Sequence, residues 1–172
     1  AEASATGSIE ISGDVINELS SDIKTIKDVE TKIETAGKDS IHFTSHVLQT
    51  VLAGAIKLDA SDIHIEQTEF EVIVRYRIDG MLHDAMILPK SAGSSIIARF
   101  KVLSNLKLDE KRLPQDGRFR IELNGEKISF RVSILPTYFG EKIVMRLLRE
   151  QVSGFTLEKL GFHGRDLEIL HE

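Results

Sequence analysis

The fold class of this chain is decided by residues 118–135, which read RFRIELNGEKISFRVSIL. Apolar and polar side chains alternate on both sides of Asn124-Gly125, a dipeptide that strongly favours a two-residue turn between antiparallel strands. One face of the second strand is apolar, and its opposite face carries Arg131 between two serines. The pattern predicts a hairpin with strands at 118–123 and 126–135.

The same reasoning extends outward from this hairpin. Alternation of period two predicts further strands, with Asp79-Gly80 as a second hairpin turn, at 63–66, 72–78, 81–88 and 141–149. Helical periodicity predicts helices at 12–36, 41–58 and 91–107, and a short one within 156–171. Short connections between strands imply antiparallel pairing. We therefore expect an α+β fold, with helices packed on one face of an antiparallel sheet and an N-terminal linker helix.

Composition narrows the classes of protein that this chain can represent. Its 172 residues suit one ordinary domain with an appendage, and 41% apolar and 28% charged residues are typical of a globular protein. There is no cysteine, which excludes disulfides, thiolate metal sites and a cysteine nucleophile. No apolar run reaches the roughly 18 residues of a membrane span, and the N-terminus does not resemble a signal peptide. We expect a cytoplasmic protein.

Charge is distributed very unevenly along the chain. The net charge of −5 divides into −9 for residues 1–74, +7 for residues 75–149 and −3 for residues 150–172. Nine of the ten arginines lie in the middle window. Guanidinium groups bind phosphate in a two-pronged geometry, so a basic surface for an anionic partner is one interpretation. The alternative is an ordinary solvated sheet face balanced by carboxylates.

Complete catalytic signatures are absent from the sequence. Neither G-x-x-x-x-G-K-[ST] nor G-x-G-x-x-G occurs, so the chain has no phosphate cradle of its own. His42 and His46 share a helix face, but no third ligand is evident, and we predict neither a metal site nor catalytic residues. With two Tyr and no Trp, the chain offers little for base stacking, and we expect no nucleic-acid partner.

Four sequence boxes carry a specific resemblance to a known family. They read ASDIHIE at 60–66, RYRIDG at 75–80, EKRLPQDGR at 110–118, and FRVSILPT followed by GEKIVMRLL at 130–148. Together they resemble, in order and spacing, the hexameric traffic ATPases of type II secretion and type IV pilus assembly, the GspE/PilB type. Gln67 departs from the family pattern, where a proline is common, and we interpret this as a minor loop change.

The resemblance implies a domain organisation and a set of partners. Residues 1–38 become a linker and amphipathic helix, residues 39–150 a PAS-like second N-terminal domain, and residues 151–172 a linker toward a RecA-like ATPase domain. ATP and Mg²⁺ belong to the full-length enzyme, and these residues alone should bind neither and hydrolyse nothing. The implied partners are RecA-like domains of the same and the neighbouring subunit, and platform proteins at the inner face of the cytoplasmic membrane.

The resemblance also assigns roles to arginines. In such hexamers the N-terminal domain closes over the nucleotide, and its arginines reach the phosphates. By position in the motifs, the candidates are Arg77, Arg99, Arg112 and Arg118. Arg131 ranks below them, and Arg75 is equally well explained as a structural or subunit-contact residue. Two other readings remain: a stand-alone PAS-like sensor of a small ligand, and a nucleic-acid-binding module that uses the basic sheet face.

Overall fold

The computed structural model describes residues 13–34 and 42–150. The predicted linker at 1–8 and the predicted helix within 156–171 lie outside these residues. The helices are α2 (Gly13–Ser21), α3 (Ile26–Glu34), α4 (Phe43–Lys57) and α5 (Gly93–Leu103), with a short 3-10 turn, η1 (Lys90–Ala92), ahead of α5. The strands are β1 (Asp62–Gln67), β2 (Glu71–Ile78), β3 (Met81–Pro89), β4 (Gln115–Leu123), β5 (Glu126–Thr137) and β6 (Gly140–Glu150).

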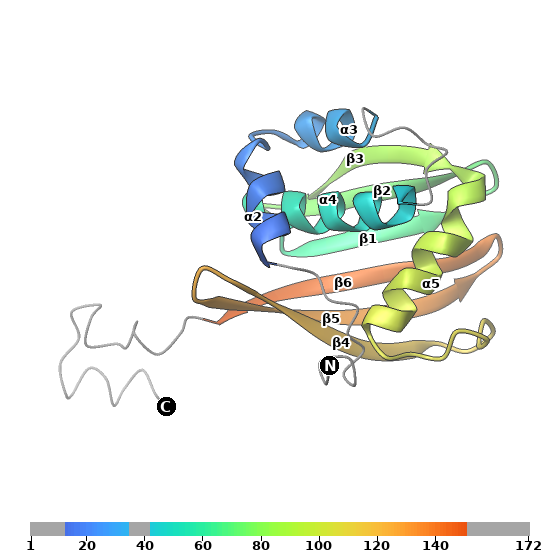
Figure 1. Cartoon of the computed structure of the whole chain (residues 1–172). Helices are drawn as coiled ribbons and strands as arrows, with labels where there is room; N and C mark the ends of the chain where they lie inside the picture. Colours follow the sequence, from blue (N-terminus) through green and yellow to red (C-terminus); the bar gives the residue numbers. More distant parts are fainter. Residues whose placement is uncertain (1–12, 35–41, 151–172) are drawn as a thin grey trace.

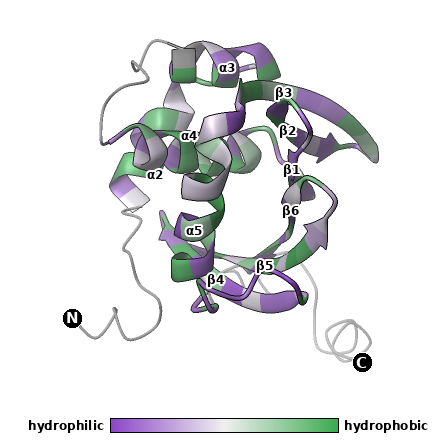
Figure 2. Ribbon diagram, turned by 90° about the vertical axis from the view of Figure 1, so that its right-hand side faces the viewer, coloured by the Kyte–Doolittle hydropathy of each residue, from purple (hydrophilic) through white to green (hydrophobic). Residues whose placement is uncertain are grey.

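The six strands form one antiparallel sheet in the order β3-β2-β1-β6-β5-β4. The pairing of β1 with β6 joins the two halves of the sheet, which are far apart in sequence. Figure 1 shows α4 lying over the first half and α5 crossing the second, and Figure 2 shows the sheet curving around the helices from one side. The α+β prediction, with helices on one face, is confirmed, whereas the PAS-like name stays a prediction.

Both predicted hairpin turns form as their sequences require. Asp79 and Gly80 have φ angles of 53° and 82°, and Asn124 and Gly125 have φ angles of 51° and 81°. Two consecutive residues with positive φ make the tight turn whose twist suits paired strands. The decisive hairpin at 118–135 is therefore confirmed, and its strands extend slightly further than predicted.

Aromatic side chains anchor the helices to the sheet. Phe119 of β4 stacks on Phe130 of β5 at 4.6 Å between ring centroids, and Phe100 of α5 packs against Phe119 at 6.5 Å. On the other half, the buried Tyr76 hydroxyl donates a hydrogen bond to the Val51 carbonyl of α4 at 2.6 Å. Most apolar strand side chains thus point toward the helices, and the alternating polar residues lie on the opposite face, which no helix of residues 13–34 and 42–150 covers and which we call the uncovered face.

The single helix predicted for residues 12–36 is wrong in one respect, because the chain breaks between α2 and α3. Asp28 causes the restart: its carboxylate accepts hydrogen bonds from the backbone amides of Lys24 and Thr25, at 2.8 and 3.0 Å. This side-chain cap competes with a continuous helix. The apolar residues of both helices nevertheless face one core, since Ile16, Ile23, Val29 and Ile33 are all buried in it.

The helix predicted at 91–107 ends earlier, at Leu103. Asn105 has a φ of 61°, and the amide of Leu106 bonds to the Lys101 carbonyl at 2.7 Å while that of Asn105 bonds to the Val102 carbonyl at 3.0 Å. These two bonds define a Schellman motif, with asparagine replacing the usual glycine. Residues 104–114 then run without helix or strand to β4.

Candidate functional site

A row of arginines crosses the uncovered face of the sheet. The strand register places the following residues directly opposite one another on successive strands from β2 to β4: Arg77, Asp62, Arg146, Arg131 and Arg118. We call the four cationic members the arginine row. Arg146, Arg131 and Arg118 occupy adjacent positions on β6, β5 and β4, and neighbouring strands lie about 4.8 Å apart. The sequence distributes the four members of the row over three separate boxes, and only strand pairing brings them together.

Asp62 anchors one end of the arginine row. Its buried carboxylate lies 3.3 Å from Nε of Arg77 and 3.3 Å from Nε of Arg146. Arg77 is also held by a bond from its Nη1 to the Gly80 carbonyl at 3.0 Å. The Arg146 side chain stays 68% exposed, so it can present its terminal nitrogens to a partner while its Nε is held by Asp62. One carboxylate therefore orients two guanidinium groups.

The other end of the row has no counter-charge. Arg118 and Arg131 are exposed, and within residues 13–34 and 42–150 neither has a hydrogen-bond or ion-pair partner for its side chain. The nearby Asp116 instead accepts a hydrogen bond from the Ser133 hydroxyl at 2.8 Å. Like charges directly opposite one another in a sheet repel, so this end of the surface gains most from binding an anion.

The structure places the remaining predicted arginines elsewhere. Arg112 lies in the segment before β4, and its guanidinium is exposed. Arg99 lies on α5, in the helical layer that covers the opposite face of the sheet, where its Nη2 donates to the Ser45 hydroxyl at 2.6 Å. Of the four candidates, Arg77 and Arg118 thus share one row, Arg112 lies just before the strand that carries Arg118, and Arg99 is separated from the row by the sheet.

Arg75 is occupied by structural contacts. Its Nε donates to Asp84 at 2.8 Å and its Nη1 to Glu66 at 3.3 Å, so it joins β1, β2 and β3 on the uncovered face. The hydrogen bond with Asp84 raises the pKa of Arg75 above the ordinary arginine value. His64 lies between Arg75 and Val144 in the same register, and its burial, with Lys142 nearby, lowers its pKa. It is therefore neutral near pH 7 and adds no charge to this face.

The sequence patterns do not single out Arg146, and they rank Arg131 below the four candidates, whereas the structure places both in the row with Arg118. Their alternating strands predict that both face outward, but the register between β5 and β6 cannot be predicted from the sequence. Gln67 was also undervalued. It ends β1, and its Oε1 accepts a hydrogen bond from the Glu141 amide at 2.8 Å, which joins the ends of two strands.

The described part of the chain offers no metal cluster and no membrane-spanning helix. His46 lies 3.2 Å from the Lys32 carbonyl and 3.4 Å from the Thr50 hydroxyl, and no three metal-ligating side chains gather in residues 13–34 and 42–150. In the same residues, no helix has the length and hydropathy that crossing a bilayer requires.

Comparison of this chain with known proteins identifies its family. The family described as Type II/IV secretion system protein matches residues 34–172, which include the whole sheet. The chain belongs to this family. The resemblance in the sequence boxes is thereby confirmed.

Relatives within the type II/IV secretion system protein family share more than a third of their aligned residues with this chain. The type IV pilus assembly ATPase PilB of Myxococcus xanthus is 38% identical, over 92% of this chain and 28% of the relative. Type II secretion system protein E of Pseudomonas aeruginosa is 37% identical over 73% of this chain and 25% of the relative. Protein HxcR of the same organism is 44% identical over 67% and 24%, respectively. The chain therefore spans about a quarter of each of these relatives.

Proposed function

We propose that this chain is an N-terminal portion of an ATPase that powers type II secretion or type IV pilus assembly. Residues 39–150 form its PAS-like domain, the preceding helices add to that domain, and residues 151–172 lead toward a RecA-like domain. In this proposal the arginine row, together with Arg112 in the segment before β4, supplies guanidinium groups to ATP that the RecA-like domain holds. The observation that carries the proposal is the alignment of Arg118, Arg131 and Arg146 on three adjacent strands.

The chemistry of phosphoryl transfer supports this role. Negative charge spreads over the γ-phosphoryl oxygens in the transition state, and an arginine that approaches them stabilises that charge strongly. Arginines fixed on a rigid sheet can be delivered and withdrawn by rotation of the whole domain. Two members of the row lack a carboxylate partner within residues 13–34 and 42–150, so phosphate contact also relieves the repulsion between them.

The proposal assigns nucleotide and metal binding to the other domain. The sequence of this chain has no G-x-x-x-x-G-K-[ST] loop, so a RecA-like domain holds ATP and Mg²⁺, and we expect no ATP turnover from these 172 residues alone. Its partners are the RecA-like domains of its own and of the neighbouring subunit in a hexamer. Platform proteins then hold the assembly at the cytoplasmic face of the inner membrane. The PAS-like sensor is not favoured by relatives that are named for secretion and pilus assembly.

The test compares arginines on and off the row, in a chain that continues into a RecA-like domain. Arg118→Ala combined with Arg131→Ala should lower kcat for ATP hydrolysis at least about 100-fold, because an arginine at the transferred phosphoryl contributes about 10³-fold or more. Arg120→Ala is the matched control, since Arg120 is equally exposed on β4 but pairs with Ser129, outside the row. Equal turnover in the row variant and the control would refute the arginine role.

A further inference from the structure

The segment at 104–114 presents a structural problem. It joins α5 to β4, carries Arg112 and leads directly to Arg118, yet it contains no helix or strand. Leu106 packs against the core, but beyond it the apolar side chains contribute little, because Leu108 and Leu113 are 50% and 62% exposed. A segment of this kind is costly to order, so its conformation must depend on polar contacts.

The strongest of these contacts starts at a buried lysine. Lys101 lies near the end of α5 and is only 1% exposed. Its ammonium lies 2.9 and 3.1 Å from the two carboxylate oxygens of Glu141, at the start of β6, and it also donates to the Glu110 carbonyl at 2.8 Å. A single side chain thus ties α5, β6 and the 104–114 segment together.

The contacts continue from Glu110 to the arginine. The Glu110 carboxylate accepts hydrogen bonds from the backbone amides of Arg112 and Leu113, at 2.8 and 3.0 Å. Further along, the Gln115 side-chain amide bonds twice to the Lys107 backbone: its Oε1 accepts from the Lys107 amide, and its Nε2 donates to the Lys107 carbonyl, each at 2.9 Å. The path from Lys101 to the Arg112 backbone is therefore unbroken and entirely polar.

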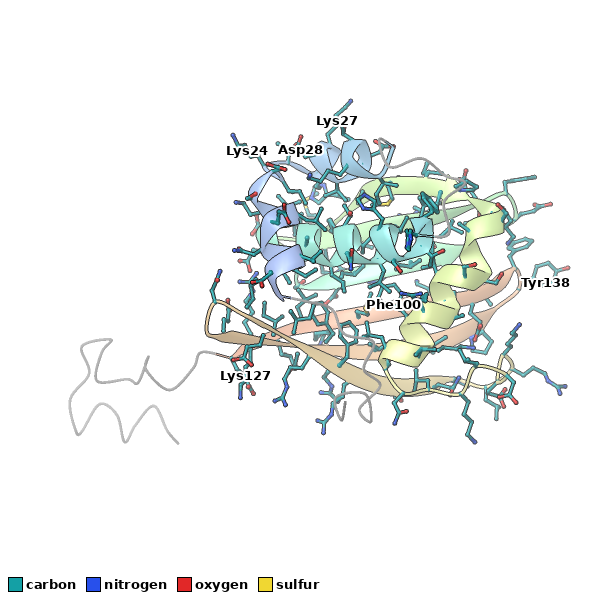
Figure 3. All side chains as sticks on the ribbon, in the orientation of Figure 1. Lys24, Lys27, Asp28, Phe100, Lys127 and Tyr138 are labelled. Atoms are coloured by element: carbon teal, nitrogen blue, oxygen red, sulfur yellow. The ribbon has the colours of Figure 1, made fainter. Side chains whose placement is uncertain are left out.

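A groove lies beside this segment. It has a volume of about 530 Å³, and it lies between Leu108 and Lys111 on one side and Thr137 and Gly140 of the β5–β6 turn on the other. Lys101 and Glu141 also line it. Figure 3 shows Tyr138 of that turn pointing away from the body of the molecule. The buried ion pair therefore connects the segment to the start of β6 beside this groove.

The energetics of buried ion pairs leave room for a role other than stability. Removing two charges from water costs several kcal/mol per ion, and a well-packed apolar pair often stabilises a protein as well or better. A buried pair does fix one geometry, because both of its members require each other. We propose that Lys101 and Glu141 are positioning residues that hold the 104–114 segment so that Arg112 is correctly presented, an inference that rests on the proposed function above.

The first test measures order in the 172-residue chain itself. Lys101→Met together with Glu141→Leu removes both charges at similar volume, so the unfolding midpoint should stay close to that of the parent chain. The NMR backbone order parameters of residues 107–113 should fall from about 0.85 toward 0.6. Lys101→Met alone should unfold more easily, because it leaves the Glu141 carboxylate buried without a partner. If Lys101→Met alone does not fold, the order parameters of the double variant still test the proposal.

The control uses a surface pair far from the segment. Lys32 and Asp22 join α3 to the end of α2 at 3.1 Å, and their exposed pairing has no connection to Arg112. Lys32→Gln with Asp22→Asn should leave the order of residues 107–113 unchanged. An ordered segment in the Lys101–Glu141 double variant overturns the proposal.

The second test measures turnover in the chain joined to a RecA-like domain. The double variant should lower kcat about tenfold with KM for ATP nearly unchanged, and adding Arg112→Ala should cost little more, because the two changes act on the same contact. A mobile segment with parent-level kcat overturns the positioning role. Failure of the arginine role itself is separately visible, since Arg118→Ala with Arg131→Ala would then leave turnover unchanged.

Discussion

At the scale of single residues, one acidic side chain, Asp62, orients two of the arginines of the site. Asp62 was part of a recognised box, but its role follows from its place between β2 and β6, where it contacts Arg77 and Arg146. The sequence shows that the polar residues of each strand face away from the core. It does not show which of them are neighbours, because a shift of register changes every cross-strand pair.

Replacing this acid gives a prediction on stability. Asp62→Asn keeps the shape but leaves the arginine row without its anchor, so unfolding should become easier by about 1–2 kcal/mol. Part of this loss should return at high salt, which screens the repulsion among the arginines. Thermal unfolding at two ionic strengths measures both effects. Asp79→Asn, in a turn that tolerates asparagine, is the control, and an equal effect of the two substitutions would contradict the role of Asp62.

At the scale of elements, sequence periodicity located the six strands, both tight turns, α4 and α5, and it predicted α2 and α3 as one helix. Its errors lie at helix ends and share one cause. Asp28 and Asn105 end or restart helices through local hydrogen bonds and backbone angles, which periodicity of apolar residues does not record. The four-residue pattern Thr25-x-x-Asp28 resembles a capping box, and it was the available signal for the break.

The break between α2 and α3 can be tested by pH. Bonds from the Lys24 and Thr25 amides hold the pKa of Asp28 below its usual value. The folded state therefore favours the carboxylate, and this contribution is present above the unfolded-state pKa and is lost as pH falls through the folded-state pKa. Asp28→Ala should lower the unfolding temperature by a few degrees at pH 7 and progressively less toward pH 2. Lys27→Ala, on the same helix, is the control, and a pH-independent effect of Asp28→Ala would contradict the cap.

At the scale of the whole molecule, the two faces of the sheet have different tasks. One face holds the helices through an apolar core, and the other carries the arginine row, which we propose meets the nucleotide. Charge counts along the sequence already indicated a basic surface, and the family resemblance indicated phosphate. The three-dimensional arrangement changes which arginines belong together: it adds Arg131 and Arg146 to the row and separates Arg99 from it.

The central claim is that the uncovered face of the sheet meets the nucleotide. Single-turnover ATP hydrolysis by the chain joined to a RecA-like domain tests it most directly, with Arg131→Ala and Arg146→Ala in one protein and Arg99→Ala in another. The account predicts that the row variant slows the chemical step at least about 100-fold, while Arg99→Ala changes it less than about threefold. A slow Arg99→Ala protein beside a row variant of parental speed would contradict the account.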